Sequence, residues 1–253
     1  MTTRQMTRIL LSASLLLVGG CGGGAYLPEG SAEEQLAAAH RLLERGKERK
    51  ALEAFQAIAR SHPGTEYEEE ARFGLARCHR KMEDYPTAIQ EYQTFRRRYP
   101  RSDLVDDAAF EIGLCYAEQR RKPEYDPAMN QQAIDHFNNF LAEFPESEWV
   151  ERAQEELVSA RTHMARKALA NGITYRKLRK QKAALFYFDL VLTDYPDTPV
   201  VPEALYWKGR SLEDSREEEE ARRTYDELAA RFAESEWGKK GAERLAELAG
   251  EGE

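Results

Sequence analysis

The residue with the clearest chemical context lies near the amino terminus, where a short apolar run ends at Cys21. Arg4 and Arg8 precede this run, which covers residues 9–18 and is too short for the ~20 residues of a membrane-spanning helix. It continues into Val-Gly-Gly-Cys, the form of a bacterial lipobox, in which small residues give a signal peptidase access to the bond before the cysteine. The sequence therefore predicts a lipoprotein signal peptide over residues 1–20 and a lipid anchor on the Cys21 thiol. An ordinary secretory peptide is the alternative.

Residues 21–31 are predicted to form a flexible tether between the anchor and the folded part. Three glycines follow Cys21, and no strand precedes them, so they do not read as a phosphate-binding loop. Removal of residues 1–20 takes two arginines from 37 basic residues and leaves 35 against 45 acidic residues, a net charge of −10. The residue after Cys21 is Gly22 and not Asp. By resemblance to Gram-negative lipoproteins, this implies sorting to the outer membrane. We expect acyl chains such as palmitate to hold the protein at the outer membrane, facing the periplasm.

No other residues have the spacing of a catalytic or metal site. The five histidines are spread along the chain without metal-ligand spacing, and the G-x-S-x-G, P-loop and H-E-x-x-H motifs are absent from the sequence. These histidines are His40, His62, His79, His136 and His163. A pI near 5.4 argues against a dedicated nucleic-acid-binding protein, which needs clustered Lys and Arg. The sequence predicts a protein that is not an enzyme and uses no metal, cofactor or nucleic acid.

The body of the chain repeats one pattern five times. Each copy has an alanine, an aromatic residue four positions later and a fixed position twelve residues after the alanine. The five copies are Ala51/Phe55/Pro63, Ala88/Tyr92/Pro100, Ala133/Phe137/Pro145, Ala184/Phe188/Pro196 and Ala221/Tyr225/Ala233. Residues at i and i+4 lie on one helix face, and a proline ends the helix, so each copy predicts a helix with an apolar face.

Two further positions turn each copy into a helical hairpin that resembles the tetratricopeptide (TPR) pattern. A Ser or Thr two residues after the proline position is expected to cap the next helix. These residues are Thr65, Ser102, Ser147, Thr198 and Ser235. A second small residue upstream of each alanine allows two helices to pack closely. The upstream residues are assigned to Ala39, Ala76, Gly113, Val158 and Gly209.

Successive repeat alanines are 37, 45, 51 and 37 residues apart, so the third repeat has 8 extra residues and the fourth has 14. The 8 lie in residues 120–127, where two prolines predict a loop. The 14 lie within residues 147–180, which contain no proline and so predict a first helix about four turns longer.

We therefore predict an all-α fold over residues 32–249, a right-handed α-α superhelix (solenoid) of five TPR-like helical hairpins with a C-terminal capping helix. The expected units are about 32–64, 65–101, 102–146, 147–197 and 198–235, with the cap at 236–249.

The concave face of such a solenoid is the expected peptide groove. By analogy with TPR proteins, the candidate groove residues are Leu36, His40, Leu43, Phe73, Arg77, Arg80, Phe110 and Leu114. Leu36, Phe73 and Phe110 share one register and predict an apolar stripe, with two arginines beside it. This combination suits a peptide with an aromatic residue and a free C-terminal carboxylate. Ordinary packing between repeats is the alternative for the stripe.

Residues 157–188 contain no Asp or Glu but eight Lys and Arg, a local asymmetry in an acidic chain. The eight are Arg161, Arg166, Lys167, Arg176, Lys177, Arg179, Lys180 and Lys182. Such a surface suits an acidic partner domain or anionic lipid head groups, and a solvated helix face is the alternative. The candidate residues for docking a partner are Arg166, Lys167, Arg176, Lys177, Arg179 and Lys180.

Nearly the whole mature chain resembles the BamD family of TPR lipoproteins of the outer-membrane β-barrel assembly (BAM) complex. The resemblance rests on the lipobox, the five repeats, both insertions and the stretches 126–137 and 164–198. It implies a scaffold in the assembly and insertion of β-barrel proteins, whose N-terminal repeats bind unfolded outer-membrane proteins. The C-terminal repeats of that family dock the POTRA domains of the central barrel-assembly subunit, and the basic window lies in that half of the chain.

One resemblance points elsewhere. The final repeat, from Ala204 to Gly209 onward, is also similar to the TPR part of the periplasmic coordinator associated with Tol-Pal. The alternative function is therefore a lipid-anchored TPR adaptor for another envelope machine, in Tol-Pal, peptidoglycan or pilus/secretion assembly.

Cys78 and Cys115 are predicted to be unpaired, buried thiols. They are 37 residues apart and share one register in successive repeats, whose helices pack 8–10 Å apart, beyond the ~7 Å between Cα atoms that a disulfide allows. Titration of the unfolded, unreduced mature protein with a thiol reagent should detect both. Detection of neither would contradict the prediction.

Overall fold

The computed structural model describes residues 29–119 and 127–250, which form eleven α-helices and no strand. The predicted signal peptide, Cys21, most of the tether and residues 120–126 of the predicted loop lie outside this part of the chain. The helices are α1 (Ala32–Glu44), α2 (Glu48–Ser61), α3 (Glu66–Lys81), α4 (Tyr85–Arg98), α5 (Val105–Gln119), α6 (Pro127–Glu143), α7 (Val150–Lys177), α8 (Gln181–Asp194), α9 (Val201–Asp214), α10 (Glu218–Arg231) and α11 (Glu236–Gly250).

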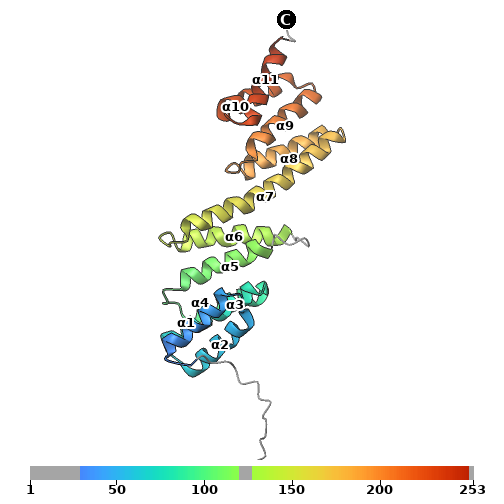
Figure 1. Cartoon of the computed structure of the whole chain (residues 1–253). Coiled ribbons are helices and arrows are strands. Elements are labelled where there is room, and N and C mark those ends of the chain that lie inside the picture. Colours follow the sequence, from blue (N-terminus) through green and yellow to red (C-terminus); the bar gives the residue numbers. More distant parts are fainter. Residues whose placement is uncertain (1–28, 120–126, 251–253) are drawn as a thin grey trace, which may run out of the picture.

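The helices form five hairpins stacked along one axis, from α1 at one end to α11 at the other (Figure 1). Each helix packs mainly on its neighbours in sequence, and α1, α5, α7 and α11 also touch a first helix of the adjacent hairpin. The apolar core is accordingly divided into five clusters instead of one centre. The predicted all-α solenoid of five TPR-like hairpins with a C-terminal capping helix is confirmed.

The repeated alanine and aromatic residues form the centre of each hairpin. All five alanines and all five aromatic residues of the pattern are 0% exposed. Burial of one such ring contributes about 1.5–3 kcal/mol relative to an exposed ring. The i, i+4 spacing places the small and the large residue on one face of the second helix, so the first helix can approach over the alanine while the ring fills the remaining space.

In three hairpins the aromatic ring lies directly against a glycine of the first helix. A Cβ added at Gly113, Gly172 or Gly209 would lie 2.6 Å or less from the ring of the second helix. The rings concerned are those of Phe137, Phe188 and Tyr225. Real Cβ atoms do not approach a ring so closely, so these three crossings require glycine.

This packing corrects the sequence prediction for the fourth repeat. The small residue there is Gly172, twelve residues before Ala184, and not Val158, whose side chain is exposed. The interval of twelve is therefore the same as in the first, second and fifth repeats. The fourteen extra residues precede the glycine, because a helix can be lengthened away from its crossing point without disturbing the packing there.

The helix that contains this insertion is α7, with 28 residues, about 42 Å at 1.5 Å per residue. The predicted long first helix of the fourth repeat is thus confirmed. None of the helices in the described part of the chain, α7 included, is both long and apolar enough to cross a membrane.

The predicted Ser and Thr caps are correct at two of the five positions. Thr65 accepts a hydrogen bond from the backbone N–H of Glu68 at the start of α3, and Ser235 accepts one from Gly238 in α11. Ser102 and Ser147 instead accept from backbone N–H groups two residues ahead, before their helices begin, and Thr198 donates to Tyr195 O. These three residues stabilise a turn that precedes the helix, because the connection there is two residues longer.

Cys78 and Cys115 are fully buried and form no disulfide, as predicted. Burial raises the pKa of Cys78 to about 12 and raises the pKa of Cys115 as well. Both thiols therefore stay protonated at neutral pH and act as small apolar residues in the core.

We predict that Gly172→Ala destabilises the protein. Alanine has a higher helix propensity than glycine by about 1 kcal/mol, but the added methyl group overlaps the Phe188 ring, and such overpacking costs about 1–3 kcal/mol. Urea unfolding should show a lower free energy of unfolding. The double variant Gly172→Ala/Phe188→Leu, which makes room for the methyl group, should recover part of the loss. A stabilised single variant would contradict the proposed close contact.

Candidate functional site

The three residues of the predicted apolar stripe lie between repeats and do not form a continuous apolar stripe along an open groove. Leu36, Phe73 and Phe110 are 4%, 7% and 3% exposed and belong to three different core clusters. Phe73 meets the rings of Tyr92 and Phe95 edge-on. The structure thus favours the alternative interpretation, in which these residues pack between repeats.

Arg80 is already occupied by two carboxylates of the next repeat. Its guanidinium lies 2.6 Å from Glu111 Oε2 and 2.7 Å from Glu118 Oε1, and its side chain is 12% exposed. Burial opposes the charged form of Arg80, but these two carboxylates outweigh it and raise the pKa of the guanidinium. Burial also raises the pKa of Glu111, and Arg80 offsets part of that rise. A peptide carboxylate would therefore have to displace one of these glutamates to bind Arg80.

The remaining groove candidates fall into two separate hollows of the surface. His40 and Arg77 line a hollow of about 300 Å³ at the junction of the first two repeats, with Leu43 and Lys81 beside them. His40 also contacts Glu70 across the repeat boundary, at 3.1 Å between Nε2 and Oε1.

Arg80, Phe110 and Leu114 belong to the second hollow, which spans three successive first helices, α3, α5 and α7. We call this second hollow the Trp149 pocket; it has a volume of about 340 Å³ and is lined by Arg80, Phe110, Glu111, Leu114, Ala117, Glu118, Trp149, Arg152 and Glu156.

Sequence reasoning missed Trp149 and the acidic side of this pocket. The Trp149 ring stacks on Phe110, with 4.8 Å between ring centroids and 7° between planes, and its Nε1 donates to Asp107 Oδ1 at 3.1 Å. Asp107, Glu111 and Glu118 are four and seven residues apart, which places them along one face of α5. That spacing was visible in the sequence and could have indicated an acidic concave face.

Most of the predicted docking residues are exposed, but two arginines of the basic window are not free. Arg161 holds Asp197 with both carboxylate oxygens within 2.9 Å, and Arg176 pairs with Asp214 at 2.8 Å. Arg176 also lies over the ring of Trp207, 5.3 Å from its centroid. Arg176 therefore joins the fourth repeat to the fifth and is committed inside the fold, whereas Arg161 ties the long first helix of the fourth repeat to the end of the same repeat.

The other five docking candidates are exposed and have no ion pair with any residue that the structure describes. We call these five the basic patch: Arg166, Lys167, Lys177, Arg179 and Lys180. Two large apolar side chains beside them in sequence are also exposed, Leu178 at 59% and Phe186 at 62%. The turn between α7 and α8, which contains Arg179 and Lys180 and directly follows Lys177, lies at the edge of the stack (Figure 1). Cations around exposed apolar side chains are typical of a surface that another molecule covers.

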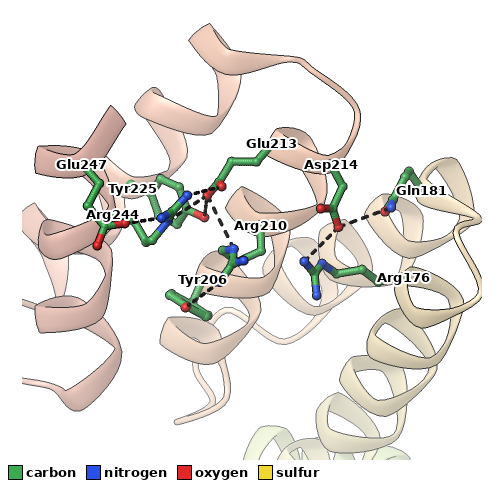
Figure 2. A network of polar contacts seen from close by, with 9 residues as sticks. All are labelled: Arg176, Gln181, Tyr206, Arg210, Glu213, Asp214, Tyr225, Arg244 and Glu247. Carbon is green, nitrogen blue, oxygen red and sulfur yellow. Dashed lines mark hydrogen bonds and ion pairs between the residues drawn. The ribbon is translucent and has the colours of Figure 1, made fainter. Parts of the chain in front are cut away.

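Adjacent acidic residues at the end of α9 tie it to both neighbouring repeats (Figure 2). Glu213 accepts hydrogen bonds from Tyr225 in α10 and Arg244 in α11, and Arg210 lies 3.6 Å away. Asp214 forms an ion pair with Arg176 of α7, in the preceding repeat. Hydrogen bonds to Glu213 raise the pKa of Arg244, and burial raises that of Tyr225. This network fixes the capping helix and holds the C-terminal half as one unit.

The stacked hairpins, the divided core and the concave and basic surfaces define a helical-repeat protein of the TPR type. The chain belongs to the YfiO family of outer membrane lipoproteins, which it matches over residues 28–228. It is 26% identical over 234 residues to the outer membrane protein assembly factor BamD of Caulobacter vibrioides, an alignment that covers 90% of this chain and 76% of that protein. The resemblance to BamD-like TPR lipoproteins is thereby confirmed.

Solved structures of TPR proteins are also similar to this chain. A thermophilic TPR protein of Thermus thermophilus has a TM-score of 0.37 and 18% identity, covering 87% of this chain and 99% of that one. A tetratricopeptide repeat protein of Parabacteroides merdae has a TM-score of 0.39 and 16% identity, covering 87% of this chain and 73% of that one.

We predict that Glu213→Ala loosens the capping helix. The substitution leaves the Tyr225 hydroxyl buried without its acceptor and Arg244 without its main partner, which costs about 1–3 kcal/mol. Amide hydrogen exchange in α11 should accelerate, while exchange in α1–α4 stays unchanged. Glu217→Ala, which removes an exposed carboxylate nearby, is the matched control. Unchanged protection of α11 would show that the network does not hold it.

Proposed function

We propose that this protein is an outer-membrane-anchored lipoprotein scaffold in the assembly and insertion of β-barrel proteins into the outer membrane. The observation that carries the proposal is the match of residues 28–228 to an outer membrane lipoprotein family, together with the 90% of the chain that aligns with a BamD assembly factor. The sequence motif search supports a non-enzymatic role, in which the helical repeats bind other proteins.

The anchor is proposed to be Cys21, with residues 1–20 removed and 21–31 acting as a tether. Acyl chains on this cysteine would hold the protein at the periplasmic side of the outer membrane. The support is the lipobox sequence and the family of lipoproteins to which the chain belongs.

The basic patch is proposed to dock the central barrel-assembly subunit through its POTRA domains. Its five cations are exposed and unpaired within the described residues, and three of them lie close in sequence to the exposed apolar side chains of Leu178 and Phe186. An acidic partner surface would supply both charge complementarity and cover for Leu178 and Phe186. Arg176 is left out of this proposal, because it already pairs with Asp214.

The N-terminal repeats are proposed to bind unfolded outer-membrane proteins. His40, Arg77, Arg80 and Leu114 line the two hollows of the concave face and can contact a peptide. Leu36 and Phe73 are buried in the core, whereas Phe110 also lines the second hollow. The groove is therefore narrower and more polar than a continuous aromatic stripe would be.

The alternative function is a lipid-anchored TPR adaptor for Tol-Pal, peptidoglycan or pilus/secretion assembly. Co-purification of the lipidated protein from detergent-solubilised membranes separates the two functions. A large β-barrel subunit with periplasmic domains supports barrel assembly, whereas envelope enzymes or secretins support the adaptor and would overturn the main proposal.

We predict that the double variant Lys177→Glu/Arg179→Glu lowers recovery of the barrel subunit about tenfold, because two attractive charges become repulsive at the proposed interface. The matched control is Arg97→Glu/Arg101→Glu, which makes the same charge change on exposed residues of the N-terminal half. Equal loss in both variants would indicate a general effect of charge and would contradict docking through the basic patch.

A further inference from the structure

The Trp149 pocket is a site of mixed charge with an aromatic wall. It lies where the first helices α3, α5 and α7 meet, on the side expected to be concave in a TPR solenoid, and it holds about 340 Å³. Phe110, Leu114 and Trp149 form its apolar part, and five charged side chains form the rest. Because the lining comes from three repeats, the pocket exists only when these repeats are stacked.

Neither arginine of the pocket is available for an incoming anion. Arg80 is held by two carboxylates, at 2.6 and 2.7 Å. Arg152 is likewise held by Glu155 and Glu156, both at 3.0 Å. A carboxylate ligand would have to compete with these four pairs, and the two pairs of Arg80 are largely screened from water, so the pocket disfavours anions.

The pocket has more carboxylates than guanidinium groups. Glu111, Glu118 and Glu156 line it against two arginines, and Asp107 lies next to it, bonded to the Trp149 indole. The side chains of Glu111 and Glu156 are only 14% and 6% exposed. Glu111 Oε2 is buried against Arg80 Nε, 2.6 Å away. This excess of negative charge in a partly dry site favours a cation.

We propose that the Trp149 pocket binds the side chain of an arginine or lysine from an extended peptide segment. The cation would donate hydrogen bonds to the carboxylates of Glu118 and Glu156 while its aliphatic stem and charge lie against the Trp149 ring. The concave face then recognises a positively charged residue, in contrast to the C-terminal carboxylate expected from Arg77 and Arg80. That the peptide comes from an unfolded client rests on the proposed function, but the pocket and its charge preference do not.

The test uses the full lipidated chain in detergent, labelled with 5-fluorotryptophan, so that its three tryptophans report separately by ¹⁹F NMR. The signal of Trp149 is assigned with Trp149→Phe. The probe is the blocked peptide Gly-Ser-Gly-Arg-Gly-Ser-Gly, and its partner contains citrulline, which has nearly the shape of arginine but no charge. We expect the Trp149 signal to shift and saturate with the arginine peptide, and the citrulline peptide to bind at least about fivefold more weakly.

Glu118→Gln is the variant that removes one of the proposed partners, and it should weaken binding of the arginine peptide about fivefold. Asp226→Asn changes the net charge equally at an exposed site in α10 and should leave binding unchanged, which controls for general attraction to an acidic protein. Circular dichroism checks that both variants fold.

Equal binding of the two peptides, tighter binding of a glutamate peptide, or no saturable shift of the Trp149 signal would overturn the proposal. Loss of binding in Asp226→Asn as large as in Glu118→Gln would do the same. These outcomes concern purified protein and a short peptide. They are therefore distinct from failure of the proposed function, which is judged by the proteins recovered from membranes.

Discussion

The structure depends on one repeated contact, an aromatic ring of the second helix set over a small residue of the first. Where that small residue is glycine, as at Gly113, Gly172 and Gly209, a single added carbon would overlap the ring. The contact fixes the distance and crossing point of each hairpin. It is complete within one repeat, so the chain needs no central core and is stabilised by neighbours only. For the same reason a repeat can gain fourteen residues in α7 without altering the packing of the others.

A solenoid of this kind must still hold successive repeats in register, and ion pairs between charged side chains of neighbouring repeats contribute to this. Arg80 joins the second and third repeats, Arg176 joins the fourth and fifth, and Glu213 holds the capping helix. Partly buried pairs of this kind are costly to break singly, because the remaining partner keeps its charge in a site poor in water. Some of the charged residues that the sequence predicts to bind a partner, such as Arg80 and Arg176, therefore join the repeats instead.

The charges that remain divide the molecule into two surfaces of opposite character. One side of α5 is acidic and borders the Trp149 pocket, whereas α7 and the turn that follows it carry exposed cations close in sequence to the exposed Leu178 and Phe186. A scaffold with two such surfaces can hold a flexible client on one and a folded partner on the other. The long helix α7 belongs to both, since its first turns line the pocket and its last turn carries cations of the basic patch.

The sequence by itself determined the repeat, the hairpins, the long first helix of the fourth repeat and the two unpaired cysteines, because each follows from spacing within about fifty residues of chain. It also contained the lipobox, which is a local motif. Only the tertiary structure decided which charges are free. Arg80 meets Glu118 and Arg161 meets Asp197 at 38 and 36 residues, nearly one repeat apart, and no local pattern reveals such pairs. Likewise, Leu36, Phe73 and Phe110 share a register whether they face a groove or the next repeat. The stacking of the repeats decides between these two positions, because the burial of a side chain depends on which neighbouring repeat packs against its helix.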